Sequence, residues 1–343
     1  MIRPICQALA AVSVLVATAT PPLARESAQP HYEPPRTMDG RPDFQGVWTN
    51  ASITTLERAS AYSTLAIAPH DVARLTEEHP QNVRQRTDDG LVPTQDLLDG
   101  KDLGRGRGYN AFWIDAGTQF GLVKGEYRTS WIVDPANGKI PYSEQGRVVA
   151  AQSSRYGYDG PEARPLAERC IAVGGRVGPP MVNGAYNNNY QITQTDTEVV
   201  ILVEMIEHAR VIPLQRTQHL PSNMRPLFGD PLGHWEGDTL VVETTNFHPF
   251  HSQSANPALL SANGKVTERF TLVSATEIFY EFTVDDGAFY AQPWHGEMTF
   301  NRMTKPVYEY ACHEGNYALT GVLAGAREQE RLGKPVSATS DRE

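Results

Sequence analysis

Histidines and carboxylates gather at a few places in the sequence, and these residue types carry acid–base chemistry. The first of these groups comprises Glu204, His208 and Arg210. They are separated by even numbers of residues, so on a continuous strand their side chains would point to the same face. Converging on a cavity, they could transfer protons while Arg210 holds an anionic group. The structural alternative is an ion pair between Glu204 and Arg210, with Glu207 and His208 in an exposed turn that breaks the parity. We favour the alternative, because structural ion pairs also perturb titrating groups.

A second group lies near the C-terminal end. His295 and Glu297 are two residues apart and would share one face of a strand, with Trp294 beside them. His313 follows Cys312 and precedes another glutamate. If the two segments were neighbours, His295, Glu297 and His313 could approach a metal-ligand set. The spacing matches no standard zinc signature, so we expect neither a metal nor a cofactor, and we expect His313 to be hydrogen-bonded near a disulfide.

A third place is a run of three asparagines framed by Tyr186 and Tyr190. Asparagine tolerates left-handed backbone and bonds its own backbone, which indicates a specialised turn. A polar clamp for a ligand is the alternative, and both stay open. The candidate ligand contacts are Arg210, Tyr186, Asn188, Tyr190 and Trp294.

The composition excludes several classes of function. The formal net charge is −10, whereas nucleic-acid binding needs a basic face. No Gly-x-Ser-x-Gly element is present for serine hydrolysis. The glycine-rich run Leu103–Gly108 follows no expected strand and opens no clear helix, so it does not predict a nucleotide site.

The N-terminus is typical of an export signal. Arg3 precedes a small and apolar run that is too short to span a bilayer. We expect a signal peptide over 1–24, cleaved after Ala19 or Ala24, and a periplasmic or secreted protein without an integral membrane segment. Cys6 would leave with the signal, and Cys170 and Cys312 would then form a disulfide in an oxidising compartment. Free thiols, with a reactive Cys312, are the alternative.

The elements that must position these residues are mostly strands. Short β-forming segments are linked by turn residues without helix-length crossovers, so the sheet must be mainly antiparallel. We expect a mainly β fold, an up-and-down barrel or strongly curved sheet of about ten strands. The expected strands span 44–49, 127–133, 139–142, 190–195, 198–205, 209–214, 239–247, 266–273, 278–284, 297–302 and 307–310.

The remaining segments frame this sheet. We expect an extended arm over 25–43, a single β-rich domain over 44–333 and a disordered tail over 334–343. The N-terminal part of the domain should be irregular and partly helical, with a helix that starts near Pro69–Asp71 and stops before Pro80. A short final helix should span Leu323–Leu332.

Four motifs carry a resemblance: Pro42-Asp43-Phe44-Gln45-Gly46-Val47-Trp48-Thr49, Tyr186-Asn187-Asn188-Asn189-Tyr190-Gln191-Ile192, Trp235-Glu236-Gly237-Asp238-Thr239 and Tyr308-Glu309-Tyr310-Ala311-Cys312-His313-Glu314-Gly315-Asn316-Tyr317. As a set they resemble a widespread family of exported bacterial proteins for which no reaction is established. The resemblance therefore carries over no catalytic residues. Separately, Gly46-Val47-Trp48 is similar to the Gly-x-Trp of lipocalin-like barrels.

Three functions are consistent with these features. The first is an exported barrel-like protein that binds a small, partly apolar molecule in its cavity. The second is an acid–base enzyme of the isomerase, lyase or hydratase type, with the candidate catalytic residues Glu204, His208, His295, Glu297 and His313. The third is an envelope interaction module without a small-molecule site.

Overall fold

The computed structural model describes residues 32–89, 116–153, 155–253, 257–336 and 339–340. Residues from Tyr32 onward form one compact unit. The expected signal peptide with Cys6, the arm up to residue 31 and the Leu103–Gly108 run lie outside the described residues.

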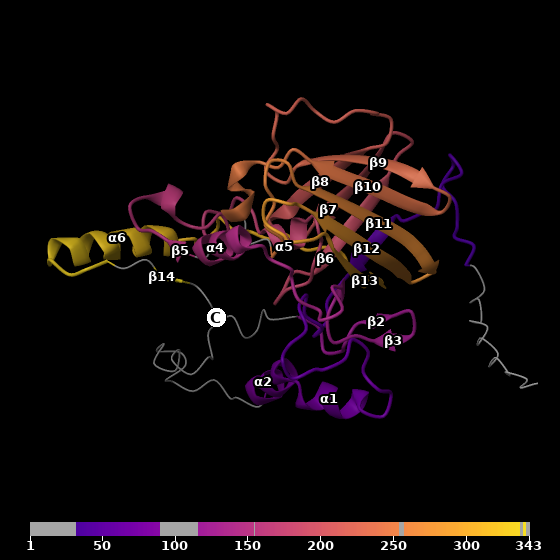
Figure 1. Ribbon diagram of the computed structural model, residues 1–343, viewed down its shortest axis with the longest axis horizontal. Helices are drawn as coiled ribbons and strands as arrows, with labels where there is room; N and C mark the ends of the chain where they lie inside the picture. Colours follow the sequence, from indigo (N-terminus) through magenta and orange to yellow (C-terminus); the bar gives the residue numbers. More distant parts are fainter. Residues whose placement is uncertain (1–31, 90–115, 154, 254–256, 337–338, 341–343) are drawn as a thin grey trace, which may run out of the picture. The chain divides into compact units, whose positions relative to one another are not determined.

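One antiparallel sheet dominates this unit (Figure 1). Its main path has the order β8-β7-β6-β1-β13-β12-β11-β10-β9, and β4 pairs with β13 beside it. The strands are β1 (Gly46–Thr49), β4 (Ile132–Asp134), β6 (Asn189–Gln194), β7 (Glu198–Val203), β8 (His208–Pro213), β9 (Asp230–Glu236), β10 (Thr239–Thr245), β11 (Lys265–Ser274), β12 (Glu277–Asp285) and β13 (Trp294–Met303). The expected mainly β fold, an antiparallel barrel or strongly curved sheet of about ten strands, is confirmed, and the sheet is nearly closed.

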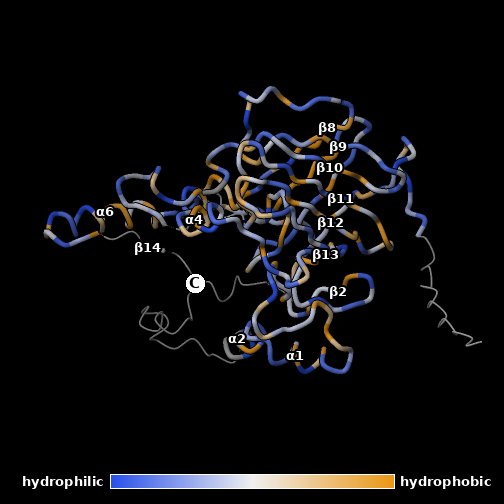
Figure 2. Tube along the Cα trace, viewed as in Figure 1, coloured by the Kyte–Doolittle hydropathy of each residue, from blue (hydrophilic) through white to orange (hydrophobic). Residues whose placement is uncertain are grey.

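Along the long strands every second residue is buried, and most of these buried residues are apolar. Figure 2 shows the apolar and polar residues along the same strands. Aromatic rings pack against one another on the inner side. The ring centroids of Phe270 and Tyr280 are 4.8 Å apart, those of Tyr280 and Phe300 5.3 Å, and those of Phe300 and Tyr190 5.2 Å. These rings form a packed aromatic core that reaches Tyr190 near the start of β6, so a ligand site has to be sought at an end of the barrel.

The barrel has a seam between β8 and β9. Each described strand on the main path is antiparallel to its bonded neighbours, and with nine strands this leaves β8 and β9 running in the same direction. They are not hydrogen-bonded to each other. A parallel step needs a long connection, and residues 214–229 supply it. β9 still approaches β8 closely, because a Cβ on Gly233 would lie 2.7 Å from the Ile212 side chain.

The two ends of the barrel differ. At one end the connections are short, and Gly237 takes the positive φ of +60° that the turn between β9 and β10 requires. Glu236 and Asp238 flank this bend. At the other end most connections are long, namely residues 50–188, 246–264 and 286–293, and the four-residue turn 204–207 lies beside them. The 214–229 connection starts at the short-turn end and reaches this end where β9 begins. We call this end the mouth.

The longest connection at the mouth holds most of the helices. It contains α1 (Val72–Glu78), α2 (Pro80–Asp89), β2 (Leu122–Val123), β3 (Glu126–Tyr127), α4 (Glu144–Ser153), β5 (Arg155–Tyr156), a 3-10 turn (Pro161–Ala163) and α5 (Gly174–Val177). The expected first helix is confirmed as α1, whose Val72 and Leu75 pack against Ile67 and Phe120. The sequence reading missed α2, which begins at Pro80, because proline stops one helix yet suits the first position of another.

Three expected strands are wrong. The segment 127–133 is not a continuous strand, because only its ends belong to β3 and β4. Residues 139–142 form only an isolated bridge between Tyr142 and Tyr290 before α4 begins. Residues 307–310 form no strand either, because β12 already occupies one edge of β13 while β1 and β4 share the other.

The C-terminal segment also differs from expectation. The final helix, α6 (Ala318–Arg331), begins five residues before the expected Leu323. The tail contains the short strand β14 (Thr339–Ser340), which pairs with β5 where disorder was expected. Within the described ranges, the helices are all too short or too polar to cross a membrane.

The expected disulfide between Cys170 and Cys312 is confirmed, with Cα atoms 5.7 Å apart. It connects the β1–β6 insertion to the segment after β13. The two cysteines are 142 residues apart in sequence, so the bond closes a large loop in the unfolded chain.

Replacing both cysteines, Cys170→Ser with Cys312→Ser, should lower the free energy of unfolding by up to about 5 kcal/mol, because the unfolded chain gains the entropy of the opened loop. Urea unfolding measures this change. In the unreduced, denatured full chain, thiol titration should find one free thiol, that of Cys6. Three free thiols would contradict the pairing.

A buried histidine closes part of the mouth. His251 lies in the 3-10 segment Pro249–Gln253, fully enclosed, with its ring 5.1 Å from that of Phe247 and 6.0 Å from that of Phe228. Burial lowers the pKa of His251 to about 4 from a usual value of 6.5. The native state therefore holds this imidazole neutral.

Between pH 6.5 and 4, His251 binds a proton in the unfolded chain but not in the folded protein. The contribution of this residue to the free energy of unfolding is therefore fully present above pH 6.5 and is lost as the pH falls to 4. The free energy of unfolding that is lost through His251 over this pH interval is on the order of 3 kcal/mol. The variant His251→Gln should lose less stability over this interval in chemical denaturation. Parallel pH curves for the variant and the original protein would refute this assignment.

Candidate functional site

At the mouth, the ends of β6, β7 and β8 form a rim whose side chains point into the barrel. Tyr190, Val203 and His208 are cross-strand partners on β6, β7 and β8. Tyr190 is fully buried and its hydroxyl accepts a hydrogen bond of 3.3 Å from Asn50. The His208 ring lies 4.9 Å from the ring of Phe228. The rim is therefore aromatic with a few polar atoms, as ligand pockets in barrel mouths are.

Below the rim lies a buried ion pair. The Arg210 guanidinium donates two hydrogen bonds to the Glu268 carboxylate, at 3.1 and 2.5 Å, and Glu268 is fully enclosed. The Tyr280 hydroxyl donates to Glu268 at 2.8 Å and accepts from the backbone N–H of Met181 at 2.9 Å. Burial alone would lower the pKa of Arg210, but the adjoining carboxylate outweighs it and raises the pKa.

A second arginine at the mouth is not paired in this way. Arg176, on α5, has its guanidinium against the backbone of Gly184, where a Cβ would lie 1.8 Å from Nη2. Within the described part of the chain, the Arg176 side chain has neither a hydrogen bond nor an ion pair, and its Nε is enclosed. The residue keeps partial exposure, and the outer nitrogens, unlike Nε, are not among the enclosed side-chain atoms without a partner.

The surroundings of Arg176 make its charge costly. Burial lowers its pKa, and the phenol oxygens of Tyr190, Tyr186 and Tyr310 oppose this only in part. Burial and then Arg210 lower the pKa of His208, so that imidazole supplies no charge near neutral pH. Of the two arginines in this region, Arg210 is paired with Glu268. Glu204 is a further buried carboxylate at this end, and asparagine side chains hold it. Among the described residues, Arg176 is therefore left without a carboxylate partner.

A recess with apolar walls lies at the same end. It has a volume of about 290 Å³ and is lined by Glu162, Leu166, Arg169, Ile171, Leu227, His248 and Phe250. Ile171 and Phe250 are among the exposed large apolar side chains. A larger recess of about 930 Å³ lies between α1 and the β2–β3 hairpin. Among the described residues that line this larger recess there is neither a lysine nor an arginine.

The asparagine run forms a turn that holds Glu204. Asn187 takes the left-handed φ of 53°. Asn187 and Asn189 donate to the Glu204 carboxylate at 2.7 and 2.9 Å, and Asn188 exchanges hydrogen bonds with the backbone of Gly184. The expected pair of Glu204 with Arg210 is therefore wrong, because Glu268 takes Arg210 and the asparagines take Glu204. Asn188 is held within the turn.

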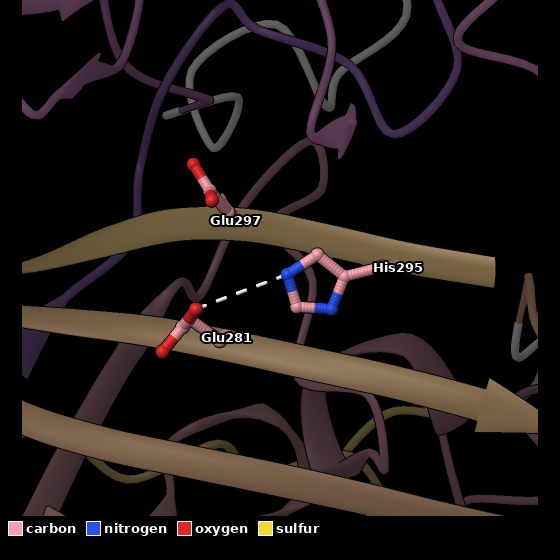
Figure 3. Close-up of side chains that lie close together, drawn as sticks. All are labelled: Glu281, His295 and Glu297. Atoms are coloured by element: carbon pink, nitrogen blue, oxygen red, sulfur yellow. Dashed lines mark ion pairs between the residues drawn. The ribbon is translucent and has the colours of Figure 1, made fainter. Parts of the chain in front are cut away.

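The five candidate catalytic residues do not form one group, although His295 and Glu297 lie together. A 3-10 turn over Met205–Glu207 breaks the parity between Glu204 and His208. His208 points into the barrel, whereas His295 and Glu297 lie on its outer face. His313 is exposed beside the disulfide. The neighbour that completes the His295–Glu297 face is Glu281 (Figure 3).

Trp294 belongs to the core. It is fully buried, with its ring 5.6 Å from Phe282 and 5.9 Å from Tyr290. This position at the start of β13 leaves no surface for a ligand.

The sequence reading missed three polar features. Glu268 was detectable, because it is a lone carboxylate on the apolar face of β11. Arg176 had no signal, since it lies in an irregular segment. The third is His219, whose ring nitrogens contact Asp230 at 2.9 Å and Glu243 at 3.3 Å. His219 thereby fastens the 214–229 connection to β9 and β10.

The variant Glu268→Gln should lower the free energy of unfolding by about 3–5 kcal/mol, because it leaves Arg210 buried without its countercharge. Replacing both members, Arg210→Met with Glu268→Met, should recover most of this loss. The control is Arg269→Met, which removes an exposed pair with Glu236 and should cost at most about 1 kcal/mol. Equal losses for Glu268→Gln and Arg269→Met in urea unfolding would contradict the assigned roles.

Comparisons with known proteins do not assign this chain to a family. The chain matches no model of a known protein family. A search of curated proteins likewise finds no match.

Proposed function

We propose that this barrel protein binds a small molecule that joins an anionic group to an apolar part. The anionic group is held by Arg176, and the apolar part lies against the aromatic and aliphatic side chains of the mouth. The observation that carries the proposal is the guanidinium of Arg176, which is enclosed at Nε, belongs to a partly exposed residue and has no partner among the described residues.

Energetics favour an anionic ligand. A buried charge without a partner is destabilising, and natural proteins pair such charges almost always. The neighbouring Arg210 is paired by Glu268, so the barrel can supply a carboxylate where the fold requires one. A carboxylate, sulfonate or phosphate on a ligand would give Arg176 the bidentate hydrogen bonds that guanidinium favours. Tyr186 and Tyr310, close enough to act on its charge, could donate to the same group.

The proposed setting is the periplasm or the extracellular space. The disulfide supports it, because such bonds persist mainly in oxidising compartments. The signal-like N-terminus and the resemblance to a family of exported bacterial proteins support the same proposal. Binding fits such a protein better than acid–base catalysis does, because the candidate catalytic residues lie on opposite faces of the barrel wall and in an exposed turn.

The test is a pair of fluorescent probes, 1-anilinonaphthalene-8-sulfonate and its uncharged analogue N-phenyl-1-naphthylamine. The variant Arg176→Met should weaken binding of the sulfonate about 10- to 100-fold, because a hydrogen-bonded charge is lost. Binding of the uncharged probe should change little. Fluorescence titration measures both, with Arg74→Met, which alters an exposed arginine of α1, as the control.

Stability separates a binding role from a structural one. Removing an unpaired buried charge should raise the free energy of unfolding of the ligand-free protein by about 1–3 kcal/mol. A less stable Arg176→Met variant whose affinity for the sulfonate is unchanged would overturn the proposal.

A further inference from the structure

The outer face of the barrel brings an imidazole and two carboxylates together (Figure 3). Glu281 on β12 is the cross-strand partner of Glu297 on β13, and His295 precedes Glu297 by two residues. One ligand atom from each of the three lies within 4.8 Å of the others, and all three residues are half-buried. We call this group the His295 cluster.

A neighbouring side chain sets the orientation of the imidazole. Thr283 is the cross-strand partner of His295, and its hydroxyl oxygen lies 3.1 Å from Nδ1. Nε2 then faces Glu281, with 3.9 Å between Nε2 and the carboxylate oxygen. Histidines that bind metals commonly have one ring nitrogen engaged in this way while the other binds the ion.

Cations already lie near one carboxylate. The Lys124 Nζ is 2.9 Å from Glu297, and an Arg128 nitrogen is 3.8 Å away. Arg128 is nearly buried and lies closer to Glu126, at 3.2 Å. Lys124 extends from the β2–β3 turn with more than half of its side chain exposed. An incoming cation can therefore displace Lys124 without rearranging the core.

We propose that the His295 cluster binds a divalent transition-metal ion such as Zn²⁺. The ligands are Nε2 of His295 and one oxygen each from Glu281 and Glu297, and water takes the remaining position. Ligand atoms held tetrahedrally at about 2.1 Å from an ion lie about 3.4 Å apart, so closure requires side-chain shifts of about 1 Å. The imidazole favours zinc-like ions over calcium or magnesium. The site would connect β12 to β13 on the wall and is independent of the mouth.

Isothermal titration of chelator-treated protein with Zn²⁺ tests the site. We expect one equivalent to bind, and we expect His295→Ala and Glu281→Gln each to weaken binding at least about tenfold. Thr283→Val should weaken it through the imidazole orientation, whereas Lys124→Ala should strengthen it severalfold by removing a competing cation. Calcium chloride should produce no comparable heat.

The control is His234→Ala, which should bind Zn²⁺ as the original protein does. His234 precedes Glu236 with the same spacing on β9, but among the described residues it belongs to no group of three such ligands. Thermal melts followed by circular dichroism check that each variant folds. Should a variant fail to fold, Co²⁺ absorption by the unaltered protein must still show four-coordinate nitrogen and oxygen ligation. Absence of Zn²⁺ binding, or binding unaffected by His295→Ala, overturns the proposal.

Discussion

The main constraint on this barrel is that nine strands, an odd number, cannot all be antiparallel to both of their neighbours. With an odd number of strands, two neighbours must run in the same direction, and here they are β8 and β9. The chain meets this requirement with the long 214–229 connection, which His219 fastens through Asp230 and Glu243. It also places glycine at 233, where a Cβ would lie 2.7 Å from the Ile212 side chain of β8. At this seam, side-chain packing joins two strands that are not hydrogen-bonded to each other.

The two arginines Arg210 and Arg176 differ in whether a carboxylate pairs with them. Arg210 and Glu268 satisfy each other, and Tyr280 extends their network to the backbone of Met181. Such a pair stabilises little compared with apolar packing, but its two members depend on each other strongly. Arg176 has no such partner in the described chain. The fold can satisfy a buried guanidinium, and it leaves one at the mouth unsatisfied.

Much of the fold could be predicted from the sequence, and the reason is local. Alternation along β11 and β12, turn residues such as Gly237 and the absence of long crossovers indicate an antiparallel barrel. The cysteine pair followed from compartment logic. Residues 307–310 show the limit of local patterns, because their β-forming character cannot reveal that both edges of β13 are occupied.

The candidate site was harder to predict, because it depends on contacts between distant segments. The parity that links Glu204 to His208 holds on a continuous strand and fails across Met205–Glu207, whose two residues after Met205 take positive φ angles. Tyr190 was among the predicted ligand contacts, but Arg176, whose charge it affects, comes from a short segment without periodicity. Glu281 joins His295 only through the register of β12 and β13.

The disulfide has a mechanical consequence. All strands from β6 to β13 lie between Cys170 and Cys312, so the bond makes this part of the barrel a covalently closed ring. A force applied to the two ends of the chain passes through the sulfur–sulfur bond and bypasses those strands, while β1 lies outside the ring and bears the load directly. A single proteolytic cut within the ring likewise leaves both fragments attached. Between Cys170 and Cys312 the chain therefore remains in one piece after a cut that would divide it without the bond.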